Sequence, residues 1–183
     1  QSLRDLAPDF LVVIAYGLIL PQNVLDIPRI APINVHASLL PRYRGRAPIH
    51  FALLHGEEVT GNTIMVMNAR MDEGDILATQ ELPINAAENL ESLHDRLSMA
   101  GAPLLVKTLV DFAERRIHPK PQDHTRAIYT TKISPVMARM NWKEKSAIEL
   151  ERQVRAMSPF PGAWFELEGE RWKAGVVEIG LDV

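Results

Sequence analysis

Two polar side chains, Asn34 and His36, interrupt an otherwise apolar run in the segment INVHASLLPRYRGRAPIH (33–50). Side chains two positions apart on a strand point to the same face, so an amide would stand beside an imidazole. The amide can donate hydrogen bonds, and the imidazole can take up or release a proton near neutral pH. The pair therefore suits a reaction that creates an oxyanion and moves a proton. A hydrogen-bonded histidine at a capped strand end explains the spacing equally well.

An arginine-rich segment follows the pair. Arg42, Arg44 and Arg46 occupy three of five consecutive positions, with Tyr43 between the first two. Guanidinium groups bind phosphates through paired hydrogen bonds, so the cluster could hold a nucleic acid. A solvated surface rim is the commoner role of such a cluster. Because the chain has a net charge of −3 and a pI near 6.1, any contact with nucleic acid would be local.

The elements around Asn34 and His36 predict an α/β fold. The continuous apolar run FLVVIA (10–15) indicates a strand covered on both faces in a parallel sheet. PQNVLDIP (21–28) predicts a short helix and IAPINVHA (30–37) a second strand, which together form a strand–helix–strand crossover. Open α/β sheets bind ligands at the carboxyl ends of their strands. We therefore expect Asn34 and His36 to lie in a ligand crevice.

Further elements would complete this domain. APIHFALLHGE (47–57) predicts a helix that starts near a proline and ends at a glycine. Two β-rich segments, 60–69 and 75–84, are separated by the polar loop RMDEG, which contains Asp72. Apolar residues at helical spacing then predict a long amphipathic helix from Asn89 to Arg115, with Asn89 as the N-cap.

A polar segment with two prolines, RRIHPKPQDHTRA, indicates a linker between two domains. We predict the C-terminal portion of a catalytic domain at 1–117, the linker at 118–127 and the start of a second, β-rich domain at 128–183. In that last part, SAIE (146–149) has the capping-box pattern of a helix start. AWFELEGERWKA then predicts a hairpin with EGE at its tip.

Composition limits the chemistry further. The 183 residues, 46% of them hydrophobic, are enough to bury a core. The absence of cysteine removes thiol nucleophiles, disulfides and Cys-ligated zinc. No apolar run approaches the roughly 18 residues that span a bilayer, and no signal-peptide pattern precedes the first strand, so we expect a cytoplasmic protein. Because the sequence begins at Gln1 in what reads as the end of a helix, we expect it to lack the start of its first domain.

Longer motifs give the chain a family resemblance. NVHASLLPRYRGRAPI and TGNTIMVMNARMDEGDI closely resemble the folate-dependent formyltransferases, in particular the members that formylate methionyl-tRNA, and the similarity extends from AYGLILP to SPFPGAW. It implies a Rossmann-like α/β core, here without its first strands and helices, followed by a linker and the start of an OB-like barrel. The implied reaction moves the formyl group of 10-formyltetrahydrofolate to the amino group of methionyl-tRNA for translation initiation.

The resemblance also assigns roles to residues. Asn34, His36 and Asp72 would be catalytic: the first two donate to the oxyanion, while Asp72 keeps His36 charged and helps to move the proton. No metal is implied. Without the resemblance, AYGLIL is equally well explained as an ordinary strand-to-helix turn, SLLP is more often plain packing, and NARMDE is explained by a polar hairpin loop. The implied folate-binding residues are Tyr16, Gly17, Leu18, Ile19, Ser38, Leu39, Leu40, Pro41, Asn68, Ala69 and Met71, and the implied tRNA contacts are Arg42, Arg44 and Arg46.

Other functions stay open at this point. The same fold serves formyltransferases that act on amino-sugar nucleotides and formyltetrahydrofolate hydrolases. The alternative from another class is a non-catalytic RNA-binding module built from the arginines and the β-rich tail, although the net charge of −3 and the Asn-x-His pair argue against it. We expect methionyl-tRNA and the folate co-substrate as partners, no membrane, and a monomeric protein.

Overall fold

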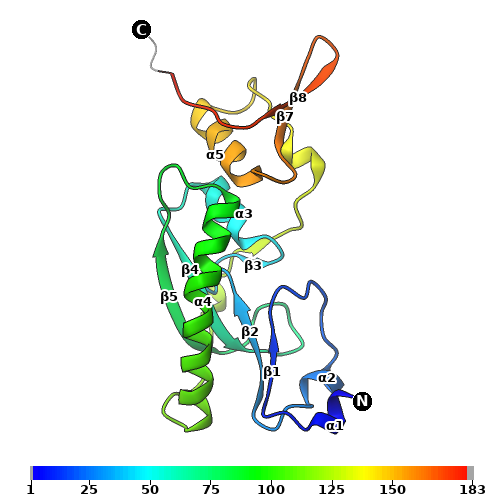
Figure 1. Ribbon diagram of the computed structural model, residues 1–183, viewed down its shortest axis with the longest axis vertical. Coiled ribbons are helices and arrows are strands. Elements are labelled where there is room, and N and C mark those ends of the chain that lie inside the picture. Colours follow the sequence, from blue (N-terminus) through cyan, green and yellow to red (C-terminus); the bar gives the residue numbers. More distant parts are fainter. Residues whose placement is uncertain (1, 181–183) are drawn as a thin grey trace.

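The computed structural model describes residues 2–180, and its centre is a four-stranded mixed sheet (Figure 1). β1 and β2 are parallel, whereas β2 pairs antiparallel with β4 and β4 antiparallel with β5. The predicted crossover is present, because a short helix connects the two parallel strands. The elements of this part are α1 (Leu3–Leu6), β1 (Phe10–Val13), α2 (Gln22–Leu25), β2 (Ala31–His36), β4 (Val59–Val66) and β5 (Ile76–Pro83).

The long helix α4 (Leu90–Ala113) packs on the sheet, as its apolar spacing predicted (Figure 1). Asn89 caps the helix by accepting a hydrogen bond from the Ser92 amide. Its apolar side lies against Ile33 and Ile64, two fully buried residues of the central strands. The sheet and this helix therefore form the layered support on which the end of β2 rests.

Strand β1 differs from the expectation of a strand buried on both faces. It lies at the edge of the sheet, and β2 is its only strand partner within residues 2–180. Val12 is 38% exposed, and Ile14, just beyond the strand, is 57% exposed. The regular strand also ends at Val13, before the predicted apolar run does. Burial on both faces requires covering layers on both sides, which this edge strand does not have here.

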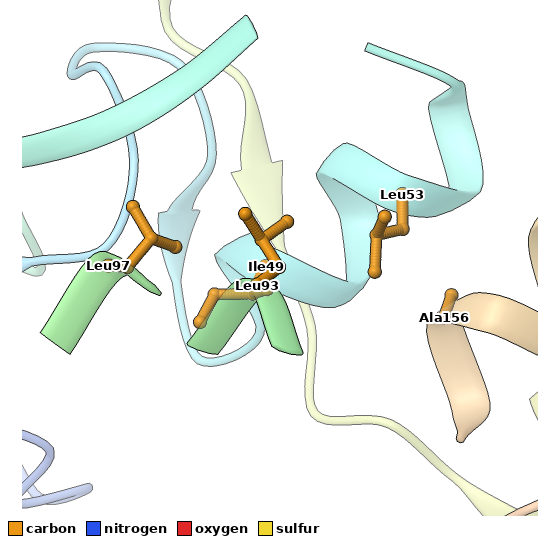
Figure 2. Close-up of a cluster of buried hydrophobic side chains, with 5 residues drawn as sticks. All are labelled: Ile49, Leu53, Leu93, Leu97 and Ala156. Atoms are coloured by element: carbon orange, nitrogen blue, oxygen red, sulfur yellow. The ribbon is translucent and has the colours of Figure 1, made fainter. Parts of the chain in front are cut away.

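A buried apolar cluster joins three helices beside the sheet (Figure 2). Each of its five members is at most 8% exposed. Burying a side chain of leucine size contributes about 1.5–3 kcal/mol, so the four larger members stabilise the packing of two helices, and one alanine brings the C-terminal helix against them. The members are Ile49 and Leu53 from α3 (Pro48–His55), Leu93 and Leu97 from α4, and Ala156 from α5 (Ala147–Met157).

The segment predicted as a linker is docked on the sheet domain. Lys120 forms a β-bridge with Ile76. The two-residue strand β6 (Tyr129–Thr130) pairs in parallel with β3 (Arg44–Gly45), and the single turn η1 (His124–Arg126) precedes it. β3 and β6 approach so closely that a Cβ atom on Gly45 would overlap the Thr130 carbonyl. The predicted domain boundaries stay predictions, but the connecting residues are not free of the sheet.

The remaining residues form a small helix-and-hairpin unit at the end of the molecule opposite α1 and α2 (Figure 1). It consists of η2 (Pro135–Ala138), α5 and the hairpin of β7 (Ala163–Leu167) and β8 (Glu170–Ala174). Ser146 and Glu149 form the predicted capping box of α5, and the hairpin turns where EGE predicted it. Within the described residues, no helix has the length and apolarity needed to cross a membrane.

Candidate active site

His36 and Asp72 meet although they are far apart in the sequence. Nδ1 of His36 lies 3.7 Å from Oδ2 of Asp72. The separation exceeds a hydrogen bond, but only 7% and 16% of the two side chains is exposed, so water would screen a charge on the ring only weakly from the carboxylate. Asn34 is half-buried on the same face of β2, two residues before His36. The structure thus brings an imidazole and a carboxylate together, with an amide on the same strand face.

The position of Asp72 depends on the fold of its loop. β4 runs antiparallel to β2 and ends with Val66 opposite Ile33, so the loop leaves the sheet several residues away from His36. It returns to His36 with Asp72 in the left-handed region, at φ 53°. Such a conformation costs roughly 1–2 kcal/mol for a residue with a Cβ atom. The amide of Gly45 donates to Oδ2 of Asp72 at 2.7 Å and fixes the oxygen that faces His36.

The second ring nitrogen of His36 has a separate partner. Nε2 lies 2.8 Å from the carbonyl oxygen of Tyr43. A carbonyl oxygen only accepts hydrogen bonds, so Nε2 carries a proton and donates it. The neutral ring therefore presents its lone pair at Nδ1, toward Asp72, and uptake of a proton there creates a cation beside the carboxylate. Nδ1 is the nitrogen that can exchange a proton in this arrangement. Because both ring nitrogens face protein acceptors, His36 fits the role of a base better than the predicted role of a donor to the oxyanion.

Tyr43 is itself held in place by a polar cluster at the end of α3. Its backbone is left-handed at φ 60°. Its hydroxyl donates to Glu57 at 2.5 Å and lies 3.1 Å from Nδ1 of His55, while Arg42 pairs with the same carboxylate. Burial of the phenol raises the pKa of Tyr43 to about 12, and the Glu57 contact adds to the effect. The cluster fixes the residue whose carbonyl orients His36.

Burial contradicts the predicted tRNA contact of Arg44. The residue is fully buried. Its Nε and Nη2 atoms donate to Oε1 of Gln122 at 3.1 and 2.7 Å, and Nη1 donates to the Tyr129 hydroxyl at 2.9 Å. Glu73 lies 3.6 Å away as a charged partner. A guanidinium enclosed by protein acceptors does not reach a phosphate in solution, so Arg44 is an internal structural residue.

The other two arginines of the cluster remain accessible. Arg46 is exposed. The side chain of Arg42 is 43% exposed, but it forms an ion pair with Glu57. A phosphate would have to compete with that carboxylate for Arg42, so Arg46 is the better placed of the two. Their contact with an acceptor stays a prediction.

The residues predicted to bind a folate differ in exposure. Ser38 and Leu40 are buried. The Ser38 hydroxyl donates to the carbonyl of Arg42 at 2.6 Å, and the Leu40 amide donates to Oγ1 of Thr63 at 3.1 Å. Packing of the turn accounts for these two side chains, which corrects their assignment to a ligand entrance. Leu39 and Pro41 are half-buried, and Tyr16, Gly17, Leu18, Ile19, Asn68, Ala69 and Met71 are exposed.

Sequence reasoning missed Gln122, which is 5% exposed. Its Nε2 donates to the carbonyl oxygens of Asp72 and Gly74 at 2.9 and 2.7 Å. A single glutamine in a polar, proline-containing stretch carries no signal of burial. The contact of the Tyr43 carbonyl with His36 was missed for a similar reason, because side-chain types do not indicate which backbone groups form hydrogen bonds.

Comparison with known proteins places this site in a family. The model of the formyl transferase family matches residues 1–109, and that of the formyl transferase C-terminal domain matches residues 132–180. The chain therefore belongs to the formyl transferase family, which confirms the resemblance found in its motifs.

Individual relatives are more specific. The chain is 50% identical over 168 residues to the methionyl-tRNA formyltransferase of Ruegeria pomeroyi, and 47% identical over 171 residues to that of Phenylobacterium zucineum. These alignments cover 92% and 93% of this chain but 55% of each relative, so the chain spans about half the length of the curated relatives that it matches.

Solved structures confirm the predicted fold. HypX from Aquifex aeolicus in complex with tetrahydrofolic acid gives a TM-score of 0.78 at 20% identity, over 92% of this chain and 30% of that protein. A sugar N-formyltransferase from a Shewanella species gives a TM-score of 0.76 at 22% identity, over 96% of this chain and 71% of that protein. At these identities, the likeness concerns the fold alone.

Proposed function

We propose that this protein transfers the formyl group of 10-formyltetrahydrofolate to the amino group of methionyl-tRNA. The names of the relatives at 50% and 47% identity support the substrate pair. The observation that carries the catalytic part is the approach of His36 Nδ1 to Asp72 Oδ2 at 3.7 Å, with Asn34 on the same strand face.

The chemistry gives each of the three residues a task. Formyl transfer makes a bond between the amine nitrogen and the formyl carbon, breaks the bond from that carbon to N10 of the folate, and moves one proton from the amine to N10. Negative charge grows on the formyl oxygen during the attack, and the amide of Asn34 is a suitable donor to it. His36 takes up the amine proton at Nδ1, and Asp72 stabilises the cation that forms. One such oxyanion donor is typically worth about 2.7–4 kcal/mol.

Exposed apolar side chains beside the catalytic strand suit a flat pterin ring. Tyr16, Leu18 and Ile19 are 56%, 67% and 64% exposed, and they follow β1, the strand that pairs with β2. Apolar groups gathered at the surface in this way are typical of ligand-binding sites. Asn68 and Met71, in the loop that carries Asp72, would meet the ligand from a second segment. A neighbour of the same fold binds tetrahydrofolic acid, which supports the same class of ligand.

The acceptor side of the proposal rests on the exposed guanidinium groups. Arg46 would hold a phosphate at the acceptor end of methionyl-tRNA. Arg42 would do the same once a phosphate replaces Glu57 as its ion-pair partner. A protein with this substrate acts where translation begins, so we propose a cytoplasmic location. We also propose that the protein is a monomer. The domain limits at 117 and 128 belong to the same proposal.

A transfer assay with competing acceptors tests the proposal. The protein is incubated with 10-formyltetrahydrofolate and, in parallel, with methionyl-tRNA, with an amino-sugar nucleotide, or with no acceptor. We expect formyl-methionyl-tRNA to form at least about 100-fold faster than either other product, the scale on which a site discriminates acceptors. Preference for the sugar amine, or loss of formyl from the folate without an acceptor, would identify the two rival reactions. Binding of tRNA without any formyl transfer would favour the RNA-binding module.

A further inference from the structure

A buried polar network connects the docked segment at 118–130 with the catalytic loop. Gln122 donates from one nitrogen to two carbonyls of the loop, those of Asp72 and Gly74, at 2.9 and 2.7 Å. Its oxygen accepts two hydrogen bonds from Arg44. Arg44 thereby fixes which end of the amide faces the loop, because a guanidinium only donates and an amide oxygen only accepts.

The network restrains Asp72 from a second side. Gly45 holds the carboxylate at Oδ2, while Gln122 holds the backbone at the carbonyl of the same residue. The left-handed conformation of Asp72 persists only if the surroundings fix it, and these two contacts are restraints of that kind. Thr130 supports the same region, since its hydroxyl donates to the Arg44 carbonyl at 3.0 Å and accepts from the Ala47 amide at 3.3 Å.

We propose that Gln122 is a positioning residue that keeps the Asp72 carboxylate directed at His36, with Arg44 setting the orientation of the Gln122 amide. The inference rests on the proposed function of Asp72 and extends the catalytic machinery into the segment that follows the sheet domain. Gln122 acts through Asp72 and does not touch the reacting groups. A displacement of about 1 Å at a catalytic group can reduce the rate about 10²-fold, so a residue with this task should affect turnover.

The chain contains a matched control for this role. Gln153 is also fully buried, donates from Nε2 to two carbonyls two residues apart, those of Met137 and Arg139, and accepts from the cation Lys145 at Oε1. Its contacts lie in the C-terminal unit rather than at the catalytic loop. The same substitution at the two glutamines therefore removes the same kind of interaction at different places.

The test compares Gln122→Glu with Gln153→Glu in the whole chain. A carboxylate at position 122 still accepts from Arg44, which favours retention of the fold, but it cannot donate to the two carbonyls. We measure hydrogen exchange of the Gly45 amide by NMR, which reports its bond to Asp72, and we measure kcat and KM of formyl transfer. In Gln122→Glu, we expect the Gly45 amide to exchange about 10-fold faster or more, and kcat to fall about 10-fold or more with KM for the folate within about threefold.

The outcomes separate the inference from the proposed function. In Gln153→Glu, the melting temperature should fall while the Gly45 amide and kcat keep their wild-type values. An unchanged Gly45 amide in Gln122→Glu would overturn the positioning role, whatever the activity. If the wild-type chain transfers no formyl group, the proposed function fails, and the Gly45 exchange rate still decides the inference. Gln122→Asn, whose shorter side chain cannot reach both carbonyls, provides a second variant, and loss of the fold in both Gln122 variants would also overturn the proposal.

Discussion

Replacing Asp72 by asparagine removes one charge from the site and little else. The amide oxygen of the introduced asparagine would still accept from the Gly45 amide, so the loop keeps the bond that now measures 2.7 Å. What disappears is the attraction between the carboxylate and a proton on Nδ1 of His36, 3.7 Å away. Unit charges about 4 Å apart interact by about 4 kcal/mol at an effective dielectric constant of about 20. Water reaches part of the Asp72 side chain, so we expect a smaller loss, at the lower end of the roughly 10²- to 10⁴-fold that general acid–base catalysis contributes.

A loss of about 2.7 kcal/mol corresponds to a fall of about 10²-fold in kcat. Initial rates at several folate and acceptor concentrations should show this fall with KM for the folate nearly unchanged, because Asp72 acts on the proton and not on ligand binding. Asp75→Asn removes the same charge from the same loop, at a residue that forms none of the ion pairs of the described structure, and should keep kcat within about twofold. Full turnover in Asp72→Asn, or a defect confined to KM, would refute the assigned role.

Three further predictions concern stability, pH and the acceptor. The raised pKa of Tyr43 means that folding favours its neutral phenol, so this contribution to stability is fully present below pH about 10 and is lost as the pH rises toward 12. In urea unfolding between pH 9 and 12, the free energy of unfolding should therefore fall more steeply with pH for the wild type than for Tyr43→Phe, and equal slopes would contradict this prediction. Leu93→Ala should reduce the free energy of unfolding by about 2–5 kcal/mol, whereas Met99→Ala, at a 79% exposed position of the same helix, should change it by less than about 0.5 kcal/mol. Arg46→Ala should lower the magnitude of the slope of log affinity for tRNA against log salt concentration by about 1, and Arg42→Ala should lower it by less because Glu57 already neutralises Arg42. An unchanged slope in both variants would show that these arginines are solvated surface residues without a tRNA contact.

Local signals predicted much of the fold. The polar residues Asn89 and Ser146 each stand before an apolar helical pattern, and α4 and α5 begin directly after them. The alternation that put Asn34 and His36 on one face is a property of any strand, so it could be read without knowing the neighbours. Motif similarity supplied the family, and family models confirm it.

Contacts between distant segments could not be predicted in this way. Asp72 reaches His36 through an antiparallel strand register and a left-handed backbone conformation, and the local sequence around Asp72 specifies neither of them. Arg42, Arg44 and Arg46 have identical spacing, yet only Arg44 enters the interior, because β6 and Gln122 arrive from far along the chain to receive it. The sequence analysis did not predict the exposure of β1, because an apolar run does not show whether a strand lies at the edge or in the middle of its sheet.

The docking of residues 118–130 on the sheet domain bears on how parts of related proteins can be recombined. A chimera joined at position 117, directly before the predicted linker, would take Lys120, Gln122 and Thr130 from a different parent than the partners they contact. Its sheet domain would receive a foreign strand beside β3 and a foreign amide behind the catalytic loop. A junction between Thr130 and Pro135 keeps these native pairs on one side and should yield exchangeable halves, apart from the helix contacts around Ala156.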